Sequence, residues 1–266
     1  MKIDFIKYHG AGNDFVVIDC MQEAYKELDL SQSQIEKICD RHFGIGADGL
    51  MFLKEDNDSD FLMDYYNSDG HRSSMCGNGA RCIVDLAQQR GYAGEKVVFM
   101  APDGLHEACR EGDLINLKMG DVKSVELTEK NHYFLDTGSP HYVVFEEDIE
   151  HLDLIKVAHK IRYNNRFSEN GTNVNLVEQD GSKLRLRTYE RGVENETLAC
   201  GTGVVASVLA HAEKSEILSM ATQEVSARGG ELSVSYERSS EGYHNIWLTG
   251  PAQKVFTGSI DLDLLI

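Results

Sequence analysis

Short runs of alternating apolar and polar residues cover most of this chain, and such alternation predicts β-strands rather than helices. The runs are rich in β-branched and aromatic residues and are separated by turns that contain glycine, asparagine or aspartate. The strands expected from these runs lie at 3–9, 15–18, 50–53, 61–66, in short pieces within 96–118 and 121–145, and at 172–178, 183–188, 221–227, 231–236, 244–248 and 253–256.

Few segments have helical spacing. Ile35 and Ile38 share one face of a helix expected at 31–40, with Ser31 or Ser33 as its N-cap. A second amphipathic helix is expected at 150–162. Many strands without a regular alternation of helices favour an α+β fold over a doubly wound sheet.

The two halves of the chain share an unusual motif, in which a cysteine in a glycine turn begins an apolar helix. Cys76 opens the first helix, which ends at Gly91, and Cys200 opens the second, at 201–213. The second helix is apolar nearly all round, so it should be enclosed rather than lie on a surface. Each half therefore offers many strands and one enclosed helix, with a boundary expected near residues 119–121.

The position of the two cysteines at helix N-termini suggests that their thiols are reactive. The first N–H groups of a helix favour anions, and a cysteine placed there tends toward the thiolate form. The glycines let a ligand carboxylate approach the backbone. Taken singly, Cys76 and Cys200 would each be interpreted as a small buried core residue. Their repetition favours a pair of thiol bases that face one substrate.

The composition limits the kinds of partner that the protein is expected to bind. The chain has 266 residues, 41% of them hydrophobic and 26% charged, as in an ordinary soluble globular protein. Its net charge of −18 argues against nucleic acid or an anionic membrane as a partner. No run reaches the ~18 apolar residues of a membrane span, and charged residues within 1–7 argue against a signal peptide. A cytoplasmic location is expected, with six reduced cysteines whose spacing suits no structural metal.

The two cysteine clusters, with His-Gly-Ala-Gly-Asn-Asp-Phe at 9–15 and Thr-Gly-Ser-Pro-His at 137–141, resemble the diaminopimelate epimerase family over essentially the whole chain. The resemblance implies two pseudo-symmetric domains, each a strand-rich, barrel-like sheet wrapped around a central helix, with the active site in the cleft between them. It implies an N-terminal epimerase domain of residues 1–118 plus 254–266, a C-terminal epimerase domain of residues 119–253, and a possible homodimer.

The same resemblance implies the reaction. The family inverts one α-carbon of LL-2,6-diaminopimelate to give the meso form, a precursor of lysine and peptidoglycan, with neither pyridoxal phosphate nor a metal. Cys76 and Cys200 would be the base and the acid on opposite faces of the carbon, and His141 and Glu190 would position and tune the thiols. The positions implied for substrate binding are Asn13, Asn67, Gly77, Asn78, Asn173, Arg191, Gly201 and Thr202.

Simpler interpretations exist for some of these residues. His141 alone could be a solvated turn histidine, and Arg191 could form a surface ion pair with Glu190 or Glu194. Ser139 and Gly49 depart from residues common in the family, which affects the contacts expected at the amino group of the substrate.

Two other functions also fit the paired cysteines. One is a proline or hydroxyproline racemase of the same fold, which has no second amino-acid end to hold. The other is a non-catalytic thiol protein, for example a redox-responsive binding module. In such a racemase, Arg191 and Asn67 would have no second amino-acid end to bind.

Overall fold

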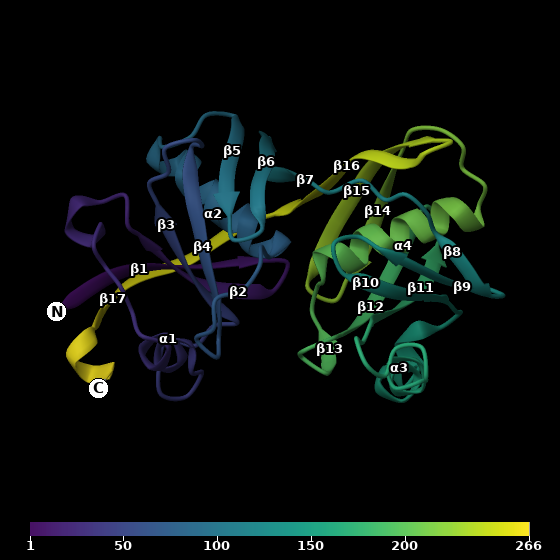
Figure 1. The fold of residues 1–266 in the computed structure, drawn as a ribbon, viewed down its shortest axis with the longest axis horizontal. Coiled ribbons are helices and arrows are strands. Elements are labelled where there is room, and N and C mark those ends of the chain that lie inside the picture. The colour runs from purple at the N-terminus through teal and green to yellow at the C-terminus, as the bar shows by residue number, and fades with distance from the viewer. Residues whose placement is uncertain (266) are drawn as a thin grey trace. The chain divides into compact units, whose positions relative to one another are not determined.

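The computed structural model describes residues 1–265, which fall into two compact units. The first unit comprises Met1–Leu117 together with the chain from Pro251 onward, and the second comprises Lys118–Gly250. Figure 1 labels the helices and strands of both units.

The first unit is built on one continuous sheet of mixed direction. Its strands are β1 (Lys2–Gly10), β2 (Asn13–Asp19), β3 (Gly49–Lys54), β4 (Phe61–Asn67), β5 (Lys96–Ala101), β6 (Gly104–Glu111), β7 (Leu114–Lys118) and β17 (Gln253–Asp261). They pair in the order β17-β1-β2-β3-β4-β5-β6-β7, in which β2–β3 and β4–β5 are parallel and the other pairs antiparallel.

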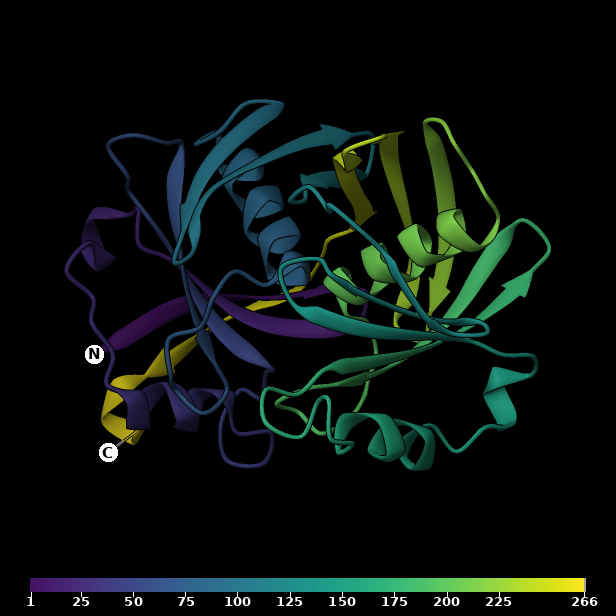
Figure 2. The ribbon, with the colours of Figure 1, turned by 45° about the vertical axis from the view of Figure 1, so that its right-hand side comes forward.

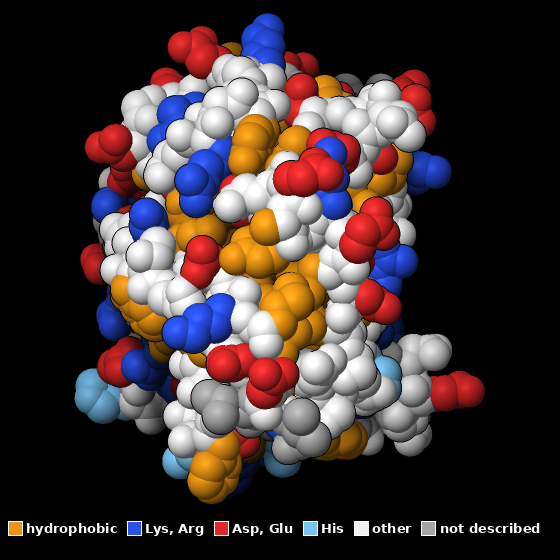
Figure 3. All heavy atoms as spheres, turned by 90° about the vertical axis from the view of Figure 1, so that its left-hand side faces the viewer, with side chains coloured by type: hydrophobic (Ala, Val, Ile, Leu, Met, Phe, Trp, Pro, Cys, Tyr) orange, Lys and Arg blue, Asp and Glu red, His pale blue; other side chains and the backbone are white. Residues whose placement is uncertain are grey.

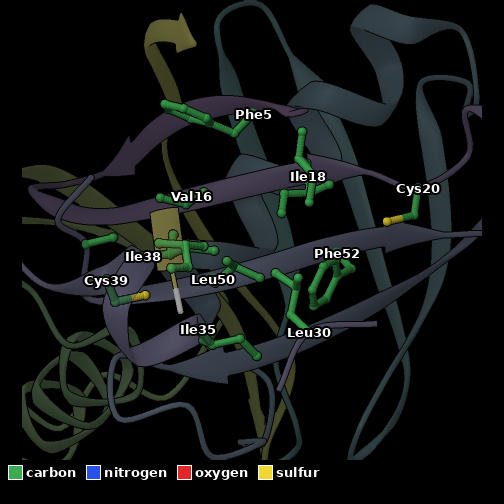
Figure 4. Packing of buried hydrophobic residues seen from close by; sticks show 13 residues of the cluster. Phe5, Val16, Ile18, Cys20, Leu30, Ile35, Ile38, Cys39, Leu50 and Phe52 are labelled. Atoms are coloured by element: carbon green, nitrogen blue, oxygen red, sulfur yellow. The ribbon is translucent and has the colours of Figure 1, made fainter. Parts of the chain in front are cut away.

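Two α-helices of the first unit lie in different surroundings. In α1 (Gln32–Cys39), Ser31 and Gln34 cap each other reciprocally at the N-terminus, and Ile35 and Ile38 are buried. Figure 4 shows these two residues packed with Val16, from β2, in one apolar cluster. By contrast, α2 (Gly77–Arg90) is buried along most of its length and packs against β1 to β4. It is therefore the enclosed helix of this unit.

The second unit is built on a sheet of the same design. Its strands are β8 (Glu126–Glu129), β9 (His132–Asp136), β10 (Pro140–Phe145), β11 (Asn173–Asp180), β12 (Lys183–Glu190), β13 (Asn195–Thr197), β14 (Ala221–Ala227), β15 (Gly230–Ser239) and β16 (Gly242–Pro251). Its helices are α3 (Leu154–Arg162) and α4 (Gly201–Lys214), and every residue of α4 from Gly203 to Ala212 is buried. In Figure 2, α4 lies among the strands of its unit.

The order of strands and helices repeats between the units. The second sheet pairs as β8-β9-β10-β11-β12-β14-β15-β16, with β10–β11 and β12–β14 parallel and the other pairs antiparallel. In each unit the first parallel crossover contains the amphipathic helix and the second contains the cysteine helix. This repetition confirms the predicted α+β fold of two pseudo-symmetric halves, each with a sheet around an enclosed helix.

The structure adjusts two local predictions. The helix expected at 150–162 begins at Leu154, because the side chain of Asp153 accepts a hydrogen bond from the N–H of Lys156 and caps it there. A short 3₁₀ turn, Ile149–His151, precedes it. The short strand β13 was not predicted, because its three residues are polar and show no apolar alternation.

Side chains of both charges are spread over the face in Figure 3, where Asp and Glu alternate with Lys and Arg around a central hydrophobic area. The acidic excess thus forms no single patch on this face. Among residues 1–265, no helix is long and apolar enough to cross a membrane.

Candidate active site

Cys76 lies at the N-cap of α2, with an extended backbone conformation (φ −106°, ψ 121°). Its side chain is partly exposed. Gly77 and Asn78 are the first two residues of the helix, so their N–H groups are among those that point out of its N-terminal end. The end of β1 lies close by, because a Cβ atom on Gly10 would lie 2.8 Å from the carbonyl oxygen of Asn78. The glycine turn after β1 therefore brings Asn13 toward the cysteine.

A chain of hydrogen bonds with a fixed direction holds the surroundings of Cys76. Arg81 donates to Asn78 Oδ1 (2.7 Å), and Asn78 Nδ2 donates to Asn13 Oδ1 (3.2 Å). Asn13 Nδ2 donates to Asp48 Oδ2 (2.6 Å). An arginine can only donate and a carboxylate can only accept. The chain therefore presents Asn13 Oδ1, an acceptor, to Cys76 Sγ at 3.5 Å.

Both ends of this chain are held in place. Arg81 is fully buried, and burial lowers the pKa of its guanidinium, although the nearby Cys82 and Cys76 act in the opposite direction. At the other end, Arg41 donates to Asp48 (2.6 Å) and to Asp14 (2.7 Å). Burial would raise the pKa of Asp14, but hydrogen bonds from Arg41 and Lys7 outweigh it and lower the pKa to about 2.

Cys200 occupies the equivalent position in the second unit, at the N-cap of α4 (φ −113°, ψ 111°). It is more deeply buried than Cys76, with 8% of its surface exposed. Its sulfur lies 3.4 Å from the hydroxyl of Thr202, the second residue of the helix. Gly203 allows α4 to lie against the sheet, because a Cβ atom there would lie 2.6 Å from Asn175 Oδ1 and 3.3 Å from His141 Cε1.

His141, on β10, is fully buried beside the first turn of α4. Its Nε2 lies 3.0 Å from Thr202 Oγ1, and its Nδ1 lies 3.0 Å from Asn175 Nδ2. Burial, with a smaller contribution from the positive charge of Arg191, lowers the pKa of His141 to about 3. The imidazole is therefore neutral near pH 7, and the interpretation of His141 as a solvated turn residue is wrong.

Asn173 connects His141 to the segment that follows β12. It begins β11 directly opposite His141 in the parallel register with β10. Its Oδ1 accepts a hydrogen bond from the backbone N–H of Arg191 (2.8 Å), and its Nδ2 donates to Ser139 Oγ (2.8 Å). Ser139, one of the departures from the family pattern, thus supports Asn173 in this chain.

The Arg191 side chain is exposed, and its guanidinium donates to the carbonyl oxygen of Asn170 (2.9 Å). The alternative that the sequence offers for Arg191 is a surface pair with Glu190 or Glu194. Glu194 instead pairs with Arg162 (3.2 Å).

The remaining predicted residues lie at strand ends. Asn67 is the exposed last residue of β4, and it pairs across the sheet with Gly49, the first residue of β3. A Cβ atom on Gly49 would lie 2.6 Å from the carbonyl oxygen of Tyr66, so this backbone leaves no room for a side chain there. Glu190 is the half-buried last residue of β12. Gly201, like Gly77, is the first residue of a cysteine helix.

Sequence reasoning missed three residues that hold the site: Arg81, Asp48 and Asn175. Each is a polar or charged residue in or beside a segment that is otherwise buried. For Asn175 a signal existed, since two asparagines interrupt the apolar run 172–177 that becomes β11. Arg81 is a charged residue within an otherwise apolar helix, and its partner Asn78 lies one turn earlier on that helix. For Asp48 the partner Asn13 lies 35 residues away, so no local pattern could have found it. Among residues 1–265, no group of three or more His, Cys, Asp or Glu side chains is placed to hold a metal ion.

Comparison with known structures defines the class of the fold. A PhzF-family phenazine biosynthesis protein of Bacillus anthracis superimposes with a TM-score of 0.75 at 14% identity, covering 98% of this chain and 99% of that one. A probable proline racemase from Agrobacterium radiobacter gives a TM-score of 0.68 at 14% identity, covering 98% and 93%. At such low identity these similarities establish the fold alone.

Sequence comparison is more specific. The family model of diaminopimelate epimerase matches residues 5–125 and 133–255. The diaminopimelate epimerase of Flavobacterium psychrophilum is 43% identical over 256 residues, which cover 96% of this chain and 98% of that protein. That of Aquifex aeolicus is 37% identical over 280 residues, covering 99% of each. The chain belongs to the diaminopimelate epimerase family, a family of isomerases.

Proposed function

We propose that this protein inverts one α-carbon of LL-2,6-diaminopimelate to give the meso form, with Cys76 and Cys200 as the two proton-transfer groups. The observation that carries the proposal is the repeated placement of the two thiols. Each cysteine occupies the N-cap position of the enclosed helix that lies in the second parallel crossover of its unit. The relatives matched over nearly the whole chain at 43% and 37% identity support the substrate.

The proposed chemistry needs one thiolate and one thiol. The thiolate of one cysteine removes the α-proton, and the electron pair of the broken C–H bond stays on the carbon as a carbanion. The thiol of the other cysteine gives its proton to the opposite face, so that the configuration is inverted and the two sulfurs have exchanged protonation states. The reverse reaction uses them in exchanged roles, and no cofactor takes part in the proposal.

The helix ends supply stabilisation for the charge that develops. The α-proton of an amino acid is a very weak acid, so the carbanion needs preorganised donors. We assign this role to the N–H groups of Gly77 and Asn78 in the first unit and of Gly201 and Thr202 in the second. A helix N-terminus binds a carboxylate through such N–H groups and through the helix dipole.

The other predicted site residues position the thiols or bind the substrate in this proposal. We assign His141 and Glu190 to positioning the thiols, and His141 does so as a neutral ring because its pKa lies far below 7. We assign Asn13, Asn67 and Asn173 to polar contacts with the substrate. Arg191 suits the far carboxylate of diaminopimelate, since its planar guanidinium can bind a carboxylate through two hydrogen bonds.

Domain and cellular assignments are also proposed. Residues 1–118 plus 254–266 and residues 119–253 would be the two epimerase domains. A cytoplasmic, homodimeric enzyme of lysine and peptidoglycan precursor synthesis is the form in which we expect the protein to act. Sedimentation of the purified protein tests the dimer.

Incubation with LL-2,6-diaminopimelate in deuterated water under reducing conditions tests the function directly. We expect deuterium at the α-carbon together with meso product, and no turnover in Cys76→Ala or Cys200→Ala. Cys109→Ala is the matched control, since Cys109 is also partly exposed but lies within the strand β6 rather than at a helix N-terminus. Near-normal turnover in either site variant would rule out the two-thiol scheme.

Two outcomes would favour the other functions. Turnover of proline in place of diaminopimelate would indicate a racemase for single-ended amino acids. A complete lack of deuterium incorporation would leave a non-catalytic thiol protein. We further expect mild oxidation to inactivate the enzyme and dithiothreitol to restore it, because a disulfide would consume both the base and the acid.

A further inference from the structure

A buried chain of polar side chains ends at the sulfur of Cys200. The hydroxyl of Thr188 donates to Asn175 Oδ1 (2.9 Å), and Asn175 Nδ2 lies 3.0 Å from His141 Nδ1. His141 Nε2 lies 3.0 Å from Thr202 Oγ1, which lies 3.4 Å from Cys200 Sγ. Thr188, Asn175 and His141 are at most 2% exposed, so these three side chains are shielded from bulk solvent.

The chemistry of the members gives the chain a direction. Because Asn175 Oδ1 takes the hydroxyl of Thr188, the amide nitrogen faces His141 and donates to Nδ1. A neutral imidazole carries one ring proton. Asn173 Nδ2 also lies 3.3 Å from His141 Nε2, but its two hydrogens are donated to Ser139 Oγ (2.8 Å) and to the carbonyl oxygen of Pro140 (3.1 Å). The ring proton therefore sits on Nε2 and is donated to Thr202 Oγ1. The hydroxyl proton of Thr202 is then free to be donated to Cys200 Sγ. A hydrogen bond donated to a thiolate stabilises the charged form.

We propose that Asn175 is a positioning residue for the reaction, whose amide holds His141 in the Nε2–H tautomer and thereby turns the hydroxyl of Thr202 toward the thiolate of Cys200. The consequence for catalysis rests on the function proposed above. The consequence for the protonation of Cys200 does not.

The first unit offers its cysteine the opposite kind of partner. There the chain from Arg81 to Asp48 presents Asn13 Oδ1, an acceptor, to Cys76. A thiol can donate to that oxygen and a thiolate cannot, whereas the buried positive charge of Arg81 favours the thiolate. These two polar contacts, an amide oxygen at Cys76 and a hydroxyl at Cys200, are therefore chemically unlike, although the two folds are alike.

Arg191, after β12, acts on His141 and helps to keep the ring neutral. The proposed chain itself contains two titratable groups, His141 on β10 and Cys200 before α4. A change at Asn175 should thus reach Cys200 through the ring proton and the hydroxyl rather than through a change of charge.

Alkylation measures the protonation of Cys200. The rate of iodoacetamide reaction at each cysteine, followed by peptide mass spectrometry across pH, gives a midpoint for each thiol. We expect Asn175→Leu to raise the Cys200 midpoint by about one pH unit, the size expected when a charged group loses one hydrogen bond. Thr202→Val should raise it at least as far. The Cys76 midpoint, measured in the same samples, should stay unchanged.

Ser207→Ala is the matched control. Ser207 is fully buried on the same helix, and its hydroxyl donates to the carbonyl oxygen of Gly203 (2.7 Å) rather than to the chain. Its loss should cost stability without moving the Cys200 midpoint. An unchanged Cys200 midpoint in folded Asn175→Leu, or an equal shift in Ser207→Ala, would overturn the proposal.

A second measurement needs no variant at Asn175. In protein labelled with ¹⁵N-histidine, long-range ¹H–¹⁵N correlations report which ring nitrogen of His141 carries the proton. Above the alkylation midpoint of Cys200 we expect a protonated Nε2 and a bare Nδ1, and a proton on Nδ1 would refute the proposal. Neither measurement uses diaminopimelate, so a failure of the proposed function and a failure of this inference are distinguishable.

Discussion

Replacing Gly203 by alanine tests how tightly α4 is fitted to the buried polar side chains beneath it. The added methyl group would lie 2.6 Å from Asn175 Oδ1 and 3.3 Å from His141 Cε1. The first distance is well inside van der Waals contact. Asn175 is buried and hydrogen-bonded on both sides, so it cannot swing away freely.

The expected cost combines three contributions. Overpacking of a filled core costs about 1–3 kcal/mol. Displacing Asn175 leaves His141 Nδ1 without a donor, which costs about 1–3 kcal/mol for a buried group. Alanine regains about 1 kcal/mol over glycine within a helix. We therefore expect Gly203→Ala to lower the free energy of unfolding by about 3 kcal/mol and to raise the alkylation midpoint of Cys200.

Gly79→Ala provides the comparison at the equivalent position of the first unit. There the nearest atoms to an added Cβ are Met51 Sδ (3.0 Å) and Met63 Cε (3.3 Å), both on flexible side chains. The strain is small and the helical gain offsets it, so stability should change little. Urea denaturation of both variants at pH 7 measures the difference. If Gly203→Ala were as stable and as active as Gly79→Ala, the reasoning about Asn175 would be wrong.

Contacts elsewhere in the two units give three further predictions. The pKa of His141 is about 3 in the folded protein, against 6.5 for a histidine free of such burial, so the unfolded chain binds the extra proton and stability falls as pH drops from 6.5 toward 3. This protonation contributes about 1.4 kcal/mol per pH unit to the pH dependence of the free energy of unfolding. Measured by urea denaturation, that dependence should be flatter in His141→Gln. Equal slopes in the two proteins would contradict the low pKa assigned to His141. Arg81→Met should reduce turnover about a hundredfold, because Asn78 loses the hydrogen bond from Arg81 and the end of the helix shifts. Arg81→Lys lacks the planar guanidinium and should not restore turnover. Full turnover in Arg81→Lys would show that the positive charge alone matters. Arg191→Met should raise KM for diaminopimelate without changing thermal stability, because its guanidinium is exposed; an unchanged KM would remove Arg191 from the substrate site.

Much of the fold could be predicted because it depends on local patterns. The capping box at Ser31, the left-handed glycine that ends α2 at Gly91, and the strand alternation are each set by neighbouring residues. The position of Cys76 and Cys200 at helix N-termini could be predicted for the same reason, since glycine turns and apolar spacing mark where each helix begins.

The polar chains around the cysteines could not be predicted. Asn13, Asp48 and Asn78 come from three separate segments, and they meet because β2, β3 and α2 pack together. Likewise, Asn175 and His141 face each other because β10 and β11 are parallel neighbours. A hydrogen bond between distant segments leaves no periodic signal in the sequence.

The amino-acid sequence by itself determined the elements, the repeated cysteine turns, the α+β class and the family resemblance, because each rests on local propensity or on residue identity. The tertiary structure alone decided that the C-terminal strand β17 pairs with β1 to complete the first sheet, as β8 does for β9 in the second. It also decided that one thiol meets an amide oxygen and the other a hydroxyl. Burial and packing select which polar partner each sulfur meets, and those forces act between segments that lie far apart along the chain.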